Sequence, residues 1–303
     1  MLDHPFHFGK QLKQMRHSQH LTQKEVAERA RISAETLRLV ENGKVLPKLD
    51  TLIVLGQVYQ RDILRLYSDH LYYNRQAFQQ LIHTMEAYFN RDDAKSLHSH
   101  LDLLIHLADH IQSGYHKQHL HQYIQFIRGV IFYDNDHAYD LALEHFETAL
   151  KWTVPHFTVN ALDDAIDQPL ELRILMNMAF VYHKFKQYDV YGELLNHCYR
   201  QCSSDDWLFP KICHNLSGFL IRNRHYAEGL SLSDEGIHSS LHIGNLTGLH
   251  FLYYQKAIAQ FHLDDPEYRN TIHLALSLCE ALKQDDMKER MLQQFRTSYD
   301  LHL

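Results

Sequence analysis

Residues 21–55 read LTQKEVAERARISAETLRLVENGKVLPKLDTLIVL, and this stretch carries the start and stop signals of successive helices. Thr22 and Glu25 have the spacing of a capping box, in which each side chain bonds the free backbone N–H of the other residue. The helix that they open is expected to run to Ala30 and to break near Arg31. The sequence therefore predicts a short, sharply bounded helix at this point.

A second short helix follows after a tight turn. Ser33 is its expected N-cap, residues 34–41 form it, and Asn42-Gly43 is a typical helix end. Further helices are expected over residues 8–18 and 49–59. Two short capped helices joined by a tight turn and flanked by two more are the elements of a helix-turn-helix.

The quoted stretch resembles the XRE, or lambda-repressor-like, family of DNA-binding domains. The matching signature positions are Leu21-Thr22-Gln23, Ala27, Ile32-Ser33, Leu37, Glu41-Asn42-Gly43-Lys44, Pro47 and Leu52. One departure is Arg31, where family members often have glycine. The resemblance implies that residues 1–65 form an XRE-type helix-turn-helix domain that binds an operator in double-stranded DNA.

In such a domain the second capped helix lies in the major groove. Helical spacing directs Leu37 and Val40 into the core. The positions left for base edges are Ser33, Ala34, Glu35 and Arg38. Arg38 is suited to guanine or to a phosphate, Glu35 to the amino group of cytosine, and Ala34 to a thymine methyl group. The alternative for Glu35 and Arg38 is an ordinary solvated helix face.

The phosphate backbone is expected to be held by residues at the edges of the two capped helices. We expect Gln23 and the amides around Asn42, Gly43 and Lys44 to make these contacts. Such domains read paired half-sites as dimers, so a homodimer is expected. The sequence does not indicate which surface forms it.

The bulk composition favours an all-α chain outside the membrane. Among 303 residues, 45% are hydrophobic and 22% charged, and only 11 Gly and 6 Pro are available for turns. No apolar run of membrane-spanning length and no secretory signal is recognisable, so a cytoplasmic location is expected. Residues 1–65 carry a net charge of +4 and residues 66–303 one of −11, so only the first part is suited to phosphates.

The remaining residues repeat a helical pattern. Residues 177–182 precede Tyr188, and residues 215–220 precede Tyr226, with an offset of 38 residues. A small residue recurs in the middle of the first helix of each copy, at Gly129, Ala179, Ser217 and Ala257. This resembles degenerate tetratricopeptide repeats, which implies that residues 66–303 form a right-handed α-solenoid of helix pairs with a concave face.

A helix-turn-helix followed by such repeats resembles the PlcR, PrgX and Rgg group of peptide-pheromone receptors of Gram-positive bacteria. The resemblance implies a dimeric transcription regulator used in quorum sensing. The repeats would serve dimerisation, and their concave face would capture a short signalling peptide. The alternative is a helix-turn-helix regulator whose repeats dock a protein partner and no pheromone.

Three amides occupy equivalent positions on successive first helices, at Asn177, Asn215 and Gln255. A primary amide both donates and accepts, so it can bind the backbone of an extended peptide of any sequence. Flanking aromatic residues suited to side-chain pockets are Tyr182, Phe219, Tyr253 and Tyr254. The alternative is that the amides are solvated and that the aromatic residues pack between the repeats.

Nothing in the sequence indicates an enzyme or a cofactor. No Gly-rich phosphate loop or nucleophile elbow is present. His116 and His119 share a helix face, as a metal site requires, but His121 points away and no further ligand completes the set. No metal site is therefore predicted, although the chain contains 26 His.

Overall fold

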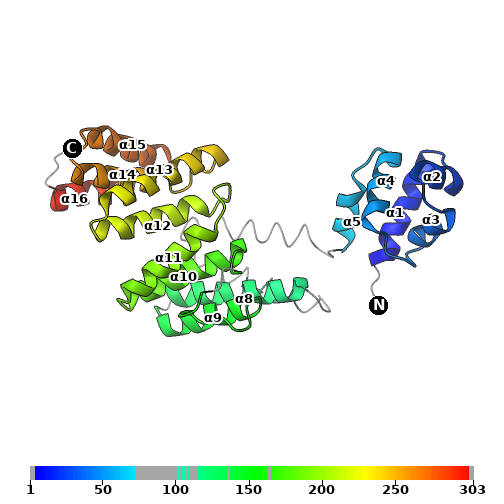
Figure 1. The fold of residues 1–303 in the computed structure, drawn as a ribbon, viewed down its shortest axis with the longest axis horizontal. Coiled ribbons are helices and arrows are strands. Elements are labelled where there is room, and N and C mark those ends of the chain that lie inside the picture. Colours follow the sequence, from blue (N-terminus) through cyan, green and yellow to red (C-terminus); the bar gives the residue numbers. More distant parts are fainter. Residues whose placement is uncertain are drawn as a thin grey trace. The chain divides into compact units, whose positions relative to one another are not determined.

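The computed structural model describes most of the chain as helices. It covers residues 4–71, 101–102, 104–106, 108, 115–134, 137–162 and 165–299, and leaves out the side chains of residues 4–6, 69–71, 115, 116 and 298. The described ranges contain no β-strand and one isolated bridge, between Thr158 and Ala161. The chain divides into two compact units, Met1–Ala87 and Tyr88–Leu303 (Figure 1). The predicted all-α class is confirmed.

The first unit consists of short helices around one core. They are α1 (His4–Ser18), α2 (Gln23–Ala30), α3 (Ala34–Glu41), α4 (Leu49–Tyr59) and α5 (Ile63–Leu71). The bounds predicted for α2, α3 and α4 are confirmed, whereas α1 begins earlier than the predicted Phe8. The capping box forms as expected, with the Glu25 backbone N–H donating to Thr22 Oγ1 at 3.2 Å and the Thr22 N–H donating to Glu25 at 2.7 Å.

The core of the first unit brings all of these helices together. Leu12, Leu37, Val40 and Leu55 are no more than 1% exposed. Helix α5 completes the core, because Leu66 and Tyr67 pack against it. The expected domain end at residue 65 therefore falls inside α5.

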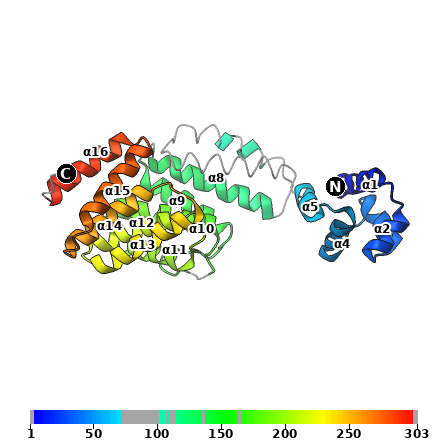
Figure 2. The ribbon, with the colours of Figure 1, turned by 90° about the horizontal axis from the view of Figure 1, so that it is seen from above.

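The second unit is a stack of helix pairs in chain order (Figure 2). The pairs are α8 (Tyr115–Asp134) with α9 (Tyr139–Lys151), α10 (Pro169–Lys184) with α11 (Tyr188–Gln201), α12 (Phe209–Arg222) with α13 (Tyr226–Ile243), and α14 (Leu249–His262) with α15 (Tyr268–Ala281). Helix α16 (Asp285–Tyr299) follows. Every second helix of a pair begins at a tyrosine that the repeat pattern aligns, so the predicted register is confirmed.

Small residues in the middle of the first helices let the backbones approach closely. Ala179, Ser217 and Ala257 are fully buried. A Cβ atom added to Gly129 would lie 2.5 Å from the ring of Phe146 on α9, a distance at which the ring would have to move. The recurring small residue is therefore a packing requirement of the helix pair.

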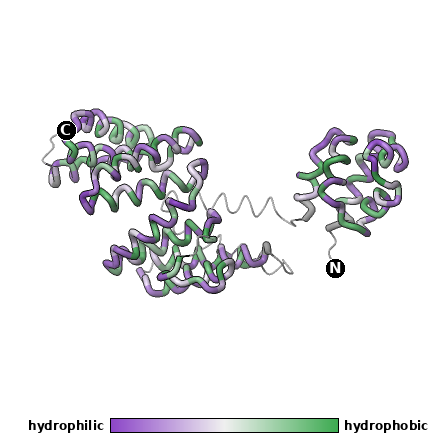
Figure 3. The backbone as a smooth tube through the Cα atoms, viewed as in Figure 1, coloured by the Kyte–Doolittle hydropathy of each residue, from purple (hydrophilic) through white to green (hydrophobic). Residues whose placement is uncertain are grey.

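Hydrophobic and hydrophilic residues alternate along the helices of both units, as amphipathic helices require (Figure 3). No helix in the described ranges combines the length and hydrophobicity of a membrane span. The four cysteines are free and buried.

Non-glycine residues in the left-handed region make several of the turns. His137, Lys186 and Arg224 each have a φ between +50° and +66° and lie two residues before the second helix of a pair. Arg31 has the same conformation at the C-cap of α2, with φ +52° and ψ +40°. The chain can therefore form tight helix ends with few glycines, at a conformational cost at each position.

Exchanging Arg31 for glycine should relieve this cost. Arg31→Gly is expected to stabilise the first unit by about 1 kcal/mol, because glycine adopts the left-handed conformation without a Cβ penalty. Arg29→Gly is the matched control: it places glycine inside α2 and should destabilise the unit by about 1 kcal/mol. Hydrogen exchange of residues 8–66 in the full-length chain measures both effects. If both variants changed the stability of the first unit in the same direction, the conclusion that Arg31 is strained would be contradicted.

Candidate functional site

Helix α3 presents its first turn to solvent and its other face to the core. Ser33 caps it, since the Thr36 backbone N–H donates to Ser33 Oγ at 2.9 Å. Leu37 and Val40 are buried. The exposed residues are Ser33, Ala34, Glu35 and Arg38. The structure thus brings together on one exposed surface the four residues that the sequence assigned to base edges.

Glu35 and Arg38 are paired with each other on this surface. Arg38 Nε and Nη2 each donate to a different carboxylate oxygen of Glu35, both at 2.6 Å. The hydrogen bond from Arg38 is the main cause that lowers the pKa of Glu35. The carboxylate is therefore ionised at neutral pH, and the charges of Glu35 and Arg38 cancel.

A buried ion pair holds α3 to α1. Arg16 Nε and Nη2 donate to the two carboxylate oxygens of Glu41 at 2.7 and 3.0 Å, and the side chain of Glu41 is fully buried. Arg16 also donates to the carbonyl of Leu21 at 3.1 Å. Charged groups out of water are tolerated only when they are paired and hydrogen-bonded, and here both conditions are met.

Gln23 joins this pair from the start of α2. Its Nε2 donates to Glu41 Oε2 at 2.7 Å. The amide that the sequence assigned to a DNA phosphate is thus engaged inside the protein. Three helices, α1, α2 and α3, converge on the carboxylate of Glu41, which fixes the orientation of α3.

The backbone amides after α3 are also engaged inside the protein. The amides of Asn42, Gly43 and Lys44 donate to carbonyls of α3 at 3.1, 3.0 and 2.9 Å. The expectation that these amides hold phosphates is therefore wrong, because they close the C-terminal turn of the helix. The side chains of Asn42 and Lys44 remain exposed.

In the second unit, the first helices expose a narrow stripe. Between Leu170 and Tyr182, the central helix α10 has only Asn177 and Phe180 less than fully buried. On α12, the accessible positions at matching spacing include Lys211, His214 and Asn215. The stripes of the two helices define the surface on which a ligand can contact them.

The predicted amide column is partly engaged within its own helices. Asn177 Nδ2 donates to the Arg173 carbonyl and Asn215 Nδ2 to the Lys211 carbonyl, each at 2.8 Å. Asn215 Nδ2 also contacts Met176 Sδ at 3.9 Å, so the amide oxygen of each residue, and the second N–H of Asn177, can still bond a ligand. Gln255 is 9% exposed and its Nε2 would lie 2.9 Å from a Cβ on Gly218 of α12, so it packs between helices.

The predicted aromatic pockets are packing contacts between helices. Tyr182 is buried. The ring of Phe219 fills the space over Gly192 of α11, where a Cβ would lie 2.6 Å away. Tyr254 lies 5.1 Å from Phe295 of α16, centroid to centroid, and burial raises its pKa. Tyr253 is half-buried on α14.

A pocket of about 240 Å³ opens beside Asn215. Three helices line it: α10 through Phe180, α12 through Lys211, His214 and Asn215, and the start of α14 through Gly248, His250 and Phe251. Trp207, which precedes α12, forms a further wall. Apart from Asn215, sequence reasoning missed these residues, because no motif connects positions on three helices.

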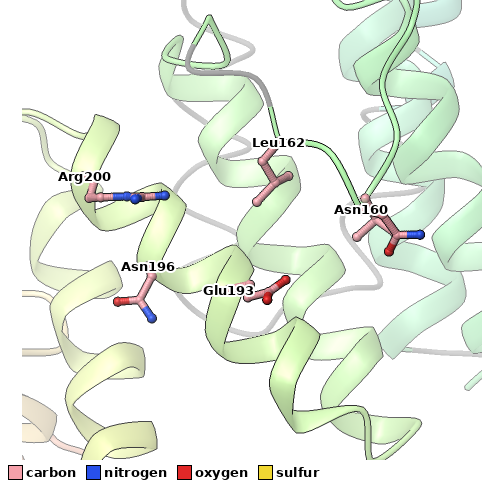
Figure 4. A pocket seen from close by; sticks show the side chains of 6 residues that line it. Asn160, Leu162, Glu193, Asn196 and Arg200 are labelled. Atoms are coloured by element: carbon pink, nitrogen blue, oxygen red, sulfur yellow. The ribbon is translucent and has the colours of Figure 1, made fainter.

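A second pocket lies between α11, the second helix of its pair, and the loop that precedes α10 (Figure 4). Val159, Asn160 and Leu162 of the loop line it together with Glu193, Asn196 and Arg200 of α11. Asn196 donates to the carbonyl of Gly192 at 2.9 Å. This pocket therefore contains one carboxylate, that of Glu193, and one guanidinium, that of Arg200.

The histidines considered for a metal are engaged with aromatic rings. His119 lies 5.3 Å from Tyr123 and His121 stacks on Trp152 at 5.0 Å, centroid to centroid. The side chain of His116 lies outside the described residues. Within the described ranges, no group of three His, Cys, Asp or Glu side chains is arranged to hold a metal ion.

Comparison with known protein families finds two matches. Residues 7–65 match a helix-turn-helix domain, and residues 95–272 match the RNPP family C-terminal domain. The second match spans more than half of the 303 residues. No curated protein sequence matches the chain.

Solved structures with the same architecture cover nearly the whole chain. The structure of Bacillus thuringiensis PlcR in complex with the peptide PapR7 and DNA has a TM-score of 0.73 at 18% identity, over 94% of this chain and 98% of that one. Apo PlcR has a TM-score of 0.61 at 17% identity, over 95% and 98%. The pheromone receptor Rgg2 of Streptococcus dysgalactiae has a TM-score of 0.57 at 13% identity, over 95% and 98%. At these identities the likeness shows the fold, and the predicted architecture is confirmed.

The buried ion pair yields a stability prediction. Glu41→Ala should destabilise the first unit by about 3–5 kcal/mol, because it leaves Arg16 buried without its counter-charge. Glu35→Ala removes a carboxylate from an exposed ion pair and should change the stability little. Hydrogen exchange of residues 8–66 in the full-length chain distinguishes the two variants. A similar effect of both would show that Glu41 is not needed to fix α3.

Proposed function

The chain belongs to the RNPP family, and from this premise we propose that it is a sequence-specific transcriptional regulator controlled by a short signalling peptide. The observation that carries the proposal is the exposed first turn of α3, held in place by the buried Arg16–Glu41 pair. A helix fixed in this way can enter a DNA groove without first having to be ordered. The regulator would act in the cytoplasm, where both DNA and a re-imported peptide are accessible.

In this proposal Arg38 and Glu35 read a G·C base pair. Arg38 bonds the acceptors of guanine and Glu35 accepts from the amino group of cytosine, which requires their mutual ion pair to open. Ala34 contacts a thymine methyl group, and Ser33 lies beside it at the groove edge. The net charge of +4 on residues 1–65 supports approach to phosphates.

Phosphate contacts would come from side chains around α3. Asn42 and Lys44 are exposed and suited to this role. Gln23 is half-buried, and its amide nitrogen is held by Glu41, so its contribution would be made by its carbonyl oxygen or by orienting α3. One such domain covers little DNA, so we propose that a homodimer reads two half-sites.

The peptide would bind on the accessible stripe of the first helices. Asn177, Asn215 and the pocket beside Asn215 lie on α10, α12 and α14. The pocket of about 240 Å³ suits one residue of an extended peptide, while the amides suit its backbone. Support also comes from PlcR, whose structure contains both the peptide PapR7 and DNA. Peptide binding would then change the affinity of the dimer for its operator.

Base recognition by Arg38 gives the first functional prediction. Duplexes selected from a random library with the full-length protein should bind Arg38→Ala about tenfold or more weakly, because the guanine contact is lost. Arg61→Ala is the matched control, because Arg61 is exposed between α4 and α5 and its substitution also removes one positive charge. Fluorescence anisotropy at fixed moderate salt measures both, and the protein-to-duplex ratio reports the dimer.

Two results would count against this assignment. If Arg38→Ala and Arg61→Ala lost the same affinity for the selected duplex, Arg38 would contribute only its positive charge and would read no base. Failure of the full-length protein to enrich any sequence over random duplex, with or without peptide, would remove DNA recognition from the proposal.

The amide at Asn215 gives the second functional prediction. Peptides captured by the full-length protein from a pool of short synthetic peptides should bind Asn215→Ala roughly three- to tenfold more weakly, because one backbone hydrogen bond is lost. Asn223→Ala is a close control, since Asn223 makes the same bond to a carbonyl four residues earlier at the exposed end of α12. Calorimetric titration provides the affinities. Equal losses in both variants would exclude a contact between Asn215 and the peptide.

A further inference from the structure

The first unit exposes an apolar surface that begins directly after α3. Its members are between 42% and 61% exposed, and they lie in the loop before α4 and along the first turns of α4. Two of them, Leu49 and Ile53, are four residues apart and therefore share one face of the helix. We call this surface the α4 patch, and it consists of Val45, Leu46, Leu49 and Ile53.

Packing inside the unit does not account for the α4 patch. The opposite face of α4 supplies Leu52, Leu55 and Tyr59 to the core, and each of these is no more than 3% exposed. The partly buried hydrophobic residues that pack against this core include Val54 and Val58, and none of the described ones belongs to the patch. An exposed apolar surface with a polar rim is typical of a contact site for another macromolecule.

The charges on this surface are self-complementary. Lys48 and Asp50 flank Leu49 in the chain, and both side chains are exposed. In the described part of the chain, neither of them has an ion-pair partner. Every contact occurs twice in a dimer with a two-fold axis. An axis beside Leu49 therefore places each Lys48 close to Asp50 of a second copy.

A second copy fits the α4 patch better than DNA does. The DNA backbone attracts cations, whereas the patch is apolar and the charges of Lys48 and Asp50 cancel. The carboxylate of Asp50 would also repel phosphates. The surface therefore matches another protein, and its paired charges match a copy of itself.

The position of the patch agrees with a contact between two reading helices. It begins one residue after Lys44, at the C-terminal end of α3. A symmetric contact there places the two α3 helices on either side of one two-fold axis, as the reading of paired half-sites requires.

The α4 patch is too small to hold a dimer together by itself. A standard protein interface buries about 800 Å² on each partner, and four partly exposed side chains supply less. The contact therefore needs a high local concentration of the second copy. Adjacent half-sites on one duplex provide that concentration.

We propose that the α4 patch joins two DNA-binding units on paired half-sites, with Leu49 at the two-fold axis and Lys48 of each copy paired with Asp50 of the other. The inference rests on the proposed DNA-binding function and names the surface that couples its two reading helices. The contact adds to any dimer formed through the repeats. It makes the occupation of one half-site favour the occupation of the other.

A neutral substitution in the full-length protein tests the apolar part of the contact. For a duplex selected by this protein, one half-site is scrambled, and the ratio of the affinities for the paired and the single half-site measures the coupling. Leu49→Gln should lower this ratio about tenfold, because less apolar area is buried in both copies, and should leave the affinity for the single half-site unchanged. Leu141→Gln is the matched control, since Leu141 is 45% exposed in the second unit. A ratio that Leu49→Gln leaves unchanged would overturn the proposal.

The sign of a charge reversal distinguishes a second copy from DNA. Asp50→Lys should lower the ratio, because two lysines then face each other across the axis. If the surface faced phosphates, Asp50→Lys would strengthen binding to both duplexes, and that result would overturn the proposal. The double variant Lys48→Asp, Asp50→Lys restores the pair with reversed polarity and should recover most of the ratio. Glu28→Lys, a charge reversal at an exposed position of α2, is the matched control.

Cysteine cross-linking separates this inference from the proposed function. The four native cysteines are buried, so a cysteine placed at each patch residue in turn adds an exposed thiol to the full-length protein. Diamide, which oxidises two thiols to a disulfide, should join two copies through at least one patch position, with Leu49→Cys the first to test, and should join Leu141→Cys far less.

The cross-link and the selected duplex give independent outcomes. If the protein binds paired half-sites and no patch position forms a cross-link, the contact fails and the DNA-binding function stands. If a patch position forms the cross-link and no duplex is enriched, the DNA-binding function fails and the contact stands as an interface between copies.

Discussion

The whole structure depends on the inability of short helices to persist alone. Helices of 8 to 20 residues are marginal in water, so each helix of this chain must bury one face against another. In the second unit the requirement is met by the recurring small residue, which brings the paired backbones together. In the first unit α2 and α3 have only eight residues each, and their ends are fixed by caps and by the carboxylate of Glu41.

The same requirement explains why the two candidate sites differ in construction. On α3, one face is committed to the core, and the exposed first turn is a rigid display of short and charged side chains. In the repeats, helices contribute accessible stripes, and only their stacking creates a pocket with aromatic walls. In the proposed function, DNA would thus be recognised by one helix, whereas a peptide would be recognised by three helices together.

Local sequence signals predicted the fold and the exposed residues of α3, but they did not predict the pocket beside Asn215. Caps gave the ends of α2 and α3 because capping depends on residues three positions apart, and the tyrosine register gave the start of each second helix. The Arg16–Glu41 pair joins residues 25 positions apart, and no local rule connects them. His214 and His250 lie on different helices, so their shared pocket follows from the stacking geometry alone. The amides of residues 42–44 are a different case, because they donate to carbonyls only three to five residues earlier, as the helix end predicted at Asn42-Gly43 requires.

The closed pair of Glu35 and Arg38 bears on how such a protein would search a genome. A guanidinium that is already neutralised by a carboxylate contributes little to long-range attraction, so the Glu35–Arg38 pair would add little to the affinity of α3 for random DNA sequence. Only a base pair that offers hydrogen-bond partners to both side chains would offset the free energy needed to open the Glu35–Arg38 pair. If α3 reads DNA as proposed, this intramolecular ion pair would shorten residence on wrong sequences and leave more of the protein free to find its operator.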